Sequence, residues 1–182
     1  MALGASIYKA HINLSNFNLH HYDDFSLTLA KHPSENESRM MFRLICYLYF
    51  AQEGLEFTKG LCETKEPELW KKGLSGEILH WLELGMPDEK KIRQALGKSE
   101  LVSIFTYHDE TAKNWHEKSQ KIFNSHDKLK GHHLRVFENG PLDKLVEKSM
   151  KLSCIVEDDH LYLGNDHERI GVQVLSGPPE LW

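Results

Sequence analysis

The sequence predicts a mixed α/β (α+β) fold, a single domain whose central mixed β-sheet is flanked by helices. Residues 77–107 read as a strand, a tight turn, a helix and a second strand, the pattern of a parallel β-α-β crossover. Residues 5–30 and 152–175 alternate apolar and polar side chains, as half-buried strands do. A chain of 182 residues is long enough to bury the core of one domain.

Composition narrows the classes of function. The net charge of −5 gives no overall basic field, so binding of nucleic acid would need a local patch. The N-terminus lacks the charged start and apolar core of a signal peptide, and no stretch approaches the roughly 18 apolar residues of a membrane span. Three scattered cysteines form no disulfide framework. We therefore expect a cytoplasmic protein without a membrane partner.

Histidines and cysteines predict no metal centre. The pairs His20-His21 and His132-His133 lie in polar, loop-like contexts, and we expect them at the surface. The cysteines have no zinc spacing, and Cys62 has no helper histidine by spacing, so it is expected to be buried or inert. There is also no phosphate-cradling glycine loop and no nucleophile elbow.

The N-terminal part of the chain predicts a hairpin and then a buried helix. Strands over 6–13 and 23–30 are joined by a turn-rich segment. After His32-Pro33, Ser34 precedes Glu37 by three residues, which is the capping-box spacing for a helix N-terminus. Apolar residues then follow helical spacing until Gly54 ends the helix.

The middle of the chain holds the β-α-β unit. A short strand at 55–59 is followed by a loop with one helical turn at 66–71. In the next strand, Leu79, Trp81 and Glu83 share one face, since strand side chains alternate. The following helix begins near Pro87-Asp88, and the strand at 102–107 completes the unit.

The remaining elements are a helix over 112–123, a strand over 134–137 and a helix over 142–150. Two or three antiparallel strands follow from Leu152.

Glu83 is the residue most in need of explanation, because a carboxylate at the end of a buried strand is costly without a partner. Lys91, in the first turns of the next helix, is placed to lean back toward it. One interpretation is a structural ion pair, with Lys90, Lys91 and Arg93 as a solvated face. The other is a catalytic site.

Three further acids are candidates for such a site. Glu66 and Glu68 flank Pro67, and both also fit a solvated loop or a helix N-terminus, while capping accounts for Glu37. If two or three of these carboxylates converge, they can hold a magnesium ion, which proteins usually bind through one or two carboxylates. Such an ion activates water and stabilises the leaving oxygen in phosphodiester cleavage.

The chain resembles the YaeQ family of small bacterial proteins over nearly its whole length. The segments that carry this resemblance are MALGASIYKA, SLTLAKHPSENESRMMFRLICYL, LEFTKGLCETKEPELW, WLELGMPDEKKIRQA and VSIFTY. The family looks like a variant of the PD-(D/E)XK, restriction-endonuclease-like nuclease superfamily. The resemblance implies one YaeQ-like domain over 1–182, with a nuclease-like core at about 34–107, an N-terminal hairpin at 5–30 and C-terminal strands at 152–175.

The resemblance also implies a site. Glu83 matches the acid of the superfamily's acid-x-lysine motif, but Gly85 stands where its lysine should be. Lys91 or Arg93 would then be the migrated cation. Glu66, or else Glu68, resembles the earlier acid, and Glu37 matches an acid that some members place on the first helix.

Two functions follow from the resemblance and remain open. One is a nuclease dependent on Mg²⁺ or Mn²⁺, in which Glu66 and Glu83 hold the metal, Glu37 assists and Lys91 supports the phosphate. Its basic patch would come from Arg39, Arg43, Lys59, Lys90, Lys91 and Arg93. The other is a non-catalytic accessory protein that binds nucleic acid or protein on a degenerate nuclease-like scaffold.

Overall fold

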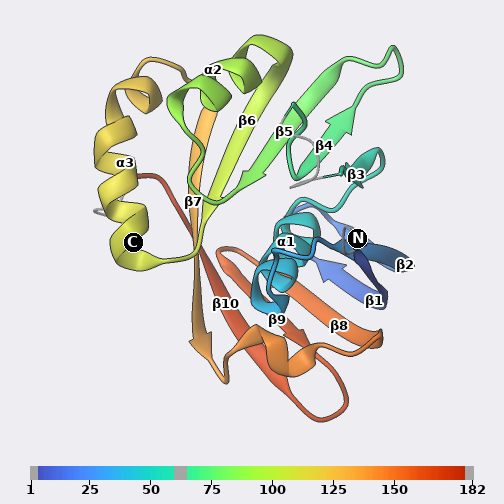
Figure 1. The fold of residues 1–182 in the computed structure, drawn as a ribbon. Helices are drawn as coiled ribbons and strands as arrows, with labels where there is room; N and C mark the ends of the chain where they lie inside the picture. The colour runs from blue at the N-terminus through green and yellow to red at the C-terminus, as the bar shows by residue number, and fades with distance from the viewer. Residues whose placement is uncertain (1–3, 60–64, 179–182) are drawn as a thin grey trace. The chain divides into compact units, whose positions relative to one another are not determined.

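The computed structural model describes residues 4–59 and 65–178, which form a mixed α+β fold rich in strands (Figure 1). The chain divides into two compact units, one of residues 1–52 and 136–173 and the other of residues 53–135 and 174–182. Among the described residues, no helix is long and apolar enough to cross a membrane. Cys62 lies outside the described residues.

The first unit is built on the predicted hairpin. Strands β1 (Ser6–Asn16) and β2 (His21–Lys31) pair antiparallel along their full lengths, which confirms and extends the prediction. Strand β8 (Ser149–Glu157) pairs parallel with β1 and antiparallel with β9 (His160–Gly164). Strand β9 pairs antiparallel with β10 (Arg169–Ser176), so the predicted C-terminal antiparallel strands are confirmed.

Two helical predictions in this unit need correction. Helix α1 (Glu37–Tyr49) is present, but its N-cap is Asn36, whose side chain accepts from the backbone N–H of Arg39 at 2.8 Å. The predicted cap, Ser34, is instead hydrogen-bonded to His32. The predicted helix over 142–150 ends early: only the 3₁₀ helix η2 (Leu142–Leu145) forms, because the alternating apolar residues from Ser149 onward belong to β8.

The second unit contains the β-α-β crossover. Strands β3 (Leu55–Phe57), β4 (Leu69–Lys72) and β5 (Ile78–Leu84) pair antiparallel in that order. Strand β6 (Ser99–Thr106) pairs parallel with β5, as the crossover predicts, and it also pairs parallel with β7 (Leu129–Glu138). The predicted helical turn at 66–71 is wrong, because Leu69 and Trp70 are held as a strand between β3 and β5.

Helices α2 (Glu89–Lys98) and α3 (Asp109–Asn124) cover the same face of this unit. Their buried residues share one core with the strands, made of Trp81, Ile92, Ala95, Leu96, Val102, Ile104, Ile122 and Leu129. The predicted sheet with helices flanking it is therefore wrong here, since both helices pack on the side that carries Trp81. In the segment expected as a nuclease-like core, 34–107, α1 belongs to the first unit and β3 to β6 belong to the second, and the nuclease-like core stays a prediction.

Candidate active site at the carboxyl end of β5

Glu83 is buried at the end of β5, with 4% of its surface exposed. Trp81, two residues earlier on the same face, donates its indole N–H to Glu83 Oε1 at 2.8 Å. Lys91 donates from Nζ to Glu83 Oε2 at 2.9 Å. The predicted partnership of Glu83 and Lys91 is confirmed, and both carboxylate oxygens have a donor.

The turn after β5 brings Lys91 back to the strand. Gly85 has a φ of +118° and donates its N–H to the carbonyl of Phe105 at 2.7 Å, which keeps the turn against β6. Asp88 then caps α2 by accepting from the backbone N–H of Lys91 at 2.8 Å. Lys91 thus stands in the first turn of α2, with 31% of its side chain exposed. The cation reaches both the buried acid and solvent.

Glu68 is the second acid of this site. It precedes β4, where its N–H donates to the carbonyl of Leu82 at 3.0 Å and its carbonyl accepts from Thr58 at 3.1 Å. Its side chain is buried, with 4% exposed, and its charge acts on Glu83. The structure therefore brings together two buried acids and one partly exposed lysine.

Burial is the main cause that raises the pKa of Glu83 above its usual value. The ammonium of Lys91 and the hydrogen bonds from Lys91 and Trp81 oppose this shift, and the negative charge of Glu68 adds to it. The direction of the shift means that the fold disfavours the ionised carboxylate, despite its two donors. A further cation beside Glu83 would favour the ionised carboxylate.

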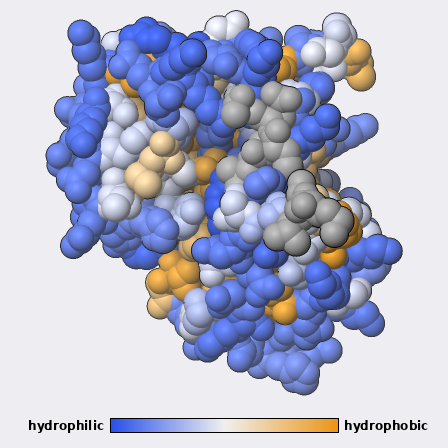
Figure 2. All heavy atoms as spheres, viewed as in Figure 1, coloured by the Kyte–Doolittle hydropathy of each residue, from blue (hydrophilic) through white to orange (hydrophobic). Residues whose placement is uncertain are grey.

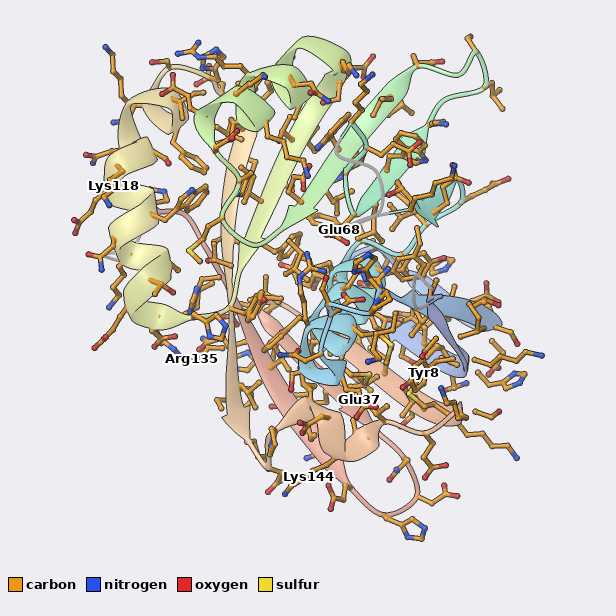
Figure 3. The ribbon with its side chains drawn as sticks, in the orientation of Figure 1. Tyr8, Glu37, Glu68, Lys118, Arg135 and Lys144 are labelled. Atoms are coloured by element: carbon orange, nitrogen blue, oxygen red, sulfur yellow. The ribbon has the colours of Figure 1, made fainter. Side chains whose placement is uncertain are left out.

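The other predicted site residues have different contacts. The carboxylate of Glu66 accepts from the backbone N–H of Lys59 at 3.4 Å. Arg93 forms an exposed pair with Glu89 on its own helix, with an Nε–Oε1 distance of 2.9 Å. Glu37 belongs to the first unit, where it accepts from the hydroxyl of Tyr8 at 3.0 Å (Figure 3).

Two of the arginines expected in the basic patch are also engaged elsewhere. Glu35, buried in the first unit, accepts from Arg39 at 2.8 Å and from Arg43 at 2.9 Å. Arg43 donates as well to the carbonyl of Ala30 at 2.8 Å. This buried ion-pair network accounts for both arginines.

A second polar cluster lies at the carboxyl end of β6 and in the middle of β7, and the sequence did not predict it. His133 is fully buried, with Nδ1 2.9 Å from Thr106 Oγ1 and Nε2 2.8 Å from Asp109 Oδ1. Asp109 Oδ2 accepts from Arg135 at 3.2 Å. The expectation that His132 and His133 are surface residues in a loop is wrong, because both are buried within β7.

His132 points to the opposite face of β7 from His133. Its Nδ1 lies 2.8 Å from Ser176 Oγ, and its ring stacks on Phe105 with centroids 4.7 Å apart. His80, on β5, lies 2.8 Å from Ser103 Oγ through Nε2. Burial lowers the pKa of both imidazoles to about 4, so both are neutral at physiological pH.

The donor set of the Glu83 site fits a hard divalent cation. Across residues 4–59 and 65–178, no three histidine, cysteine or acidic side chains converge into a metal-binding group. Magnesium, however, needs only one or two protein carboxylates and completes its shell with water and phosphate oxygens. Glu68 and Glu83 meet that requirement, since each carboxylate oxygen has more than one lone pair.

Comparison with known proteins gives one family. The family model described as YaeQ protein matches residues 1–174. The chain is 36% identical over 176 residues to a protein of Escherichia coli (strain K12) named "Uncharacterized protein YaeQ", and 33% identical to its namesake in Salmonella typhi, covering 97% of each chain in both cases.

Two crystal structures are similar. The YaeQ protein from Xanthomonas axonopodis pv. citri matches with a TM-score of 0.87 and 28% identity. The YaeQ protein from Pseudomonas syringae matches with a TM-score of 0.80 and 25% identity. Each match covers 96% of this chain and 98% of the other.

Proposed function

Because this chain belongs to the YaeQ family, and the names of its relatives carry no activity, we propose a function from its own side chains. We propose that it is a divalent-metal-dependent nuclease whose site is formed by Glu83, Glu68 and Lys91. The observation that carries this proposal is the meeting of two buried acids and a partly exposed lysine at the carboxyl end of β5. These are the residue types of a PD-(D/E)XK site.

In this proposal Glu83 and Glu68 hold the metal, Mg²⁺ or Mn²⁺. The bound ion supplies Lewis acidity and lowers the pKa of water. Lys91 moves its ammonium from Glu83 Oε2 toward the phosphate and offsets the negative charge that develops there. Its partial exposure makes that movement possible, whereas Trp81 keeps the Glu83 carboxylate in place through Oε1.

The raised pKa of Glu83 gives the metal site a pH dependence. A metal ligand must be deprotonated, so metal binding competes with the proton on Glu83. Affinity for Mn²⁺ is expected to fall as pH falls through the raised pKa of Glu83. Glu83→Gln should remove both the binding and its pH dependence.

The experiment incubates the purified chain with Mg²⁺ or Mn²⁺ and with single- and double-stranded DNA and RNA. Cleavage that is lost in Glu83→Gln and Lys91→Met, but kept in Glu100→Gln, supports the proposal. Glu100 is a matched control because it is an exposed acid on the neighbouring strand β6. Absence of cleavage, or equal cleavage by Glu83→Gln, rejects it.

A second candidate is a non-catalytic protein that binds nucleic acid or another protein. One observation favours it: both oxygens of Glu83 already have donors, from Trp81 and Lys91. That arrangement is also a complete structural ion pair. Calorimetry with Mg²⁺ separates the two candidates, since no binding in the millimolar range supports the second.

A further inference from the structure

Arg135 is the outer end of a hydrogen-bonded chain that continues through three further side chains. Its guanidinium donates to Asp109 Oδ2, and Asp109 Oδ1 faces Nε2 of His133. We assign the proton of His133 to Nε2, because the carboxylate of Asp109 can only accept. Nδ1 then accepts from the hydroxyl of Thr106. Burial lowers the pKa of His133, which favours this neutral form.

This cluster lies on the same face of the sheet as Glu83. Thr106 follows the core residue Ile104 by two positions on β6, just as Glu83 follows Trp81 by two on β5. His133 pairs in register with Thr106, and Arg135 lies two residues farther along β7. Arg135 and Glu83 are thus on the face of the sheet that α2 and α3 cover.

Arg135 differs from the other residues of the cluster in its exposure. His133 has 0% of its side chain exposed, whereas Arg135 has 33% and Asp109 has 53%. Within the described residues, Asp109 is the only ion-pair partner of Arg135, and it uses one donor of a guanidinium that has five. The remaining donors of a pre-oriented guanidinium are suited to a phosphate group.

Arg135 is too far along the sheet to act on the phosphate beside Glu83. Glu83 is in register with Ile104, and Ile104 with Gly131, which precedes Arg135 by four residues. With about 4.8 Å between strands and about 3.3 Å per residue, the two Cα atoms are about 16 Å apart. Phosphates along one strand of a duplex are spaced about 3.4 Å along the axis, so a guanidinium there meets a different nucleotide.

We propose that Arg135 is a substrate-binding residue that contacts a backbone phosphate of a nucleic acid strand a few nucleotides from the bond at Glu83. Asp109, His133 and Thr106 are its positioning residues. The identity of the ligand rests on the proposed nuclease function. Figure 3 shows Arg135 beside the connection from β6 into α3, and Figure 2 shows that the outward side of α3 is hydrophilic.

The test measures binding of a fluorescein-labelled single-stranded DNA to the full chain by anisotropy, without metal, at several salt concentrations. Arg135→Gln should weaken binding about tenfold, the order expected for one charge-assisted hydrogen bond. It should also reduce the slope of log K against log salt concentration by about 0.7, the value for one phosphate contact on a single strand. Lys130→Gln is the matched control, because Lys130 is an exposed cation on the opposite face of β7.

Asp109→Asn tests the positioning role, because a pure charge effect and a positioning effect change the DNA affinity in opposite directions. Removing a negative charge by itself should strengthen DNA binding. Loss of the orienting carboxylate should weaken binding in the wild-type background, and should no longer weaken it in Arg135→Gln. Tighter binding by Asp109→Asn in both backgrounds overturns the positioning role.

Failure of this inference is distinguishable from failure of the nuclease proposal. Arg135-dependent binding without any cleavage supports the inference and rejects the nuclease. The inference requires that Arg135→Gln raises KM and leaves kcat nearly unchanged. If the wild type cleaves and Arg135→Gln changes neither KM nor DNA binding, the inference is rejected and the nuclease proposal is kept. Absence of DNA binding by the wild type also rejects it.

Discussion

The two buried histidines His80 and His132 should make the stability of the protein fall steeply between pH 6.5 and pH 4. Each has a pKa of about 4 in the fold, against an ordinary value of 6.5. Burial is the main cause for both, with the charge of Lys71 added for His80, and the charges of His80 and Lys130 for His132. The unfolded chain therefore binds these protons at a pH where the folded chain does not, and stability is lost as pH falls.

The magnitude follows from the size of the pKa difference. A difference of about 2.5 units at about 1.4 kcal/mol per unit gives about 3.5 kcal/mol for each histidine once pH is well below 4. At pH 5, about 2 kcal/mol of this is already lost for each histidine. Native domains have only about 5–15 kcal/mol of stability, so the two together are a large fraction.

The assay is urea unfolding of wild type, His80→Gln and His167→Gln at pH 7.5, 6 and 5. Glutamine keeps a hydrogen-bonding group near Ser103 but does not titrate. We expect His80→Gln to lose about 2 kcal/mol less than wild type between pH 7.5 and pH 5. His167 is exposed, so His167→Gln serves as the control and should leave the pH dependence of stability unchanged. An equally steep loss in His80→Gln, or a folded-state pKa near 6.5 for His80 by NMR, would refute this reasoning.

Three other substitutions test the packing and charge arguments. Trp81→Phe removes a donor to Glu83, so the pKa of Glu83 should rise further in a ¹³C-carboxyl NMR titration, and no rise would contradict the assignment. Arg43→Met should cost about 3 kcal/mol in urea unfolding, because it breaks a buried pair with Glu35. Gly171→Ala should cost about 1–3 kcal/mol, since its Cβ would lie 2.7 Å from the Phe137 ring, and Phe137→Ala should remove most of that cost.

The sequence predicts those helices and strands whose apolar residues follow a single periodicity. Strand β5, helix α2 and strand β6 each keep one periodicity over their length, and a crossover of this length joins parallel strands. The pairing of Lys91 with Glu83 was predictable for the same reason, because α2 begins where β5 ends. The hairpin of β1 and β2 was predictable from alternation alone.

The errors come from non-local pairing and from competing local signals. Strand β4 is four residues long, and it is a strand because β3 and β5 lie on either side of it, which no short pattern reveals. Ser34 and Asn36 are both good N-caps two residues apart, and the capping-box spacing favoured the wrong one.

The cluster around Arg135 could not be predicted for a similar reason. His133 and Asp109 are 24 residues apart in sequence, and Arg135 and Asp109 are 26 apart. They meet only because β6 and β7 are parallel neighbours and α3 starts just after the carboxyl end of β6. A weak signal was present: His133 and Arg135 alternate with His132 and Leu134, which is the period of a strand and not of a loop.

Gly85 is the position where the chain departs from the acid-x-lysine pattern, and the backbone explains why a lysine there would be unfavourable. Its φ of +118° is one that side chains other than glycine rarely adopt, although a Cβ would meet no atom within 4 Å. The obstacle to a lysine is therefore the backbone conformation at position 85 and not a clash with a neighbouring residue. The same turn delivers Lys91 to Glu83 from α2, so the geometry that excludes a lysine at position 85 is also the one that supplies a cation from another element.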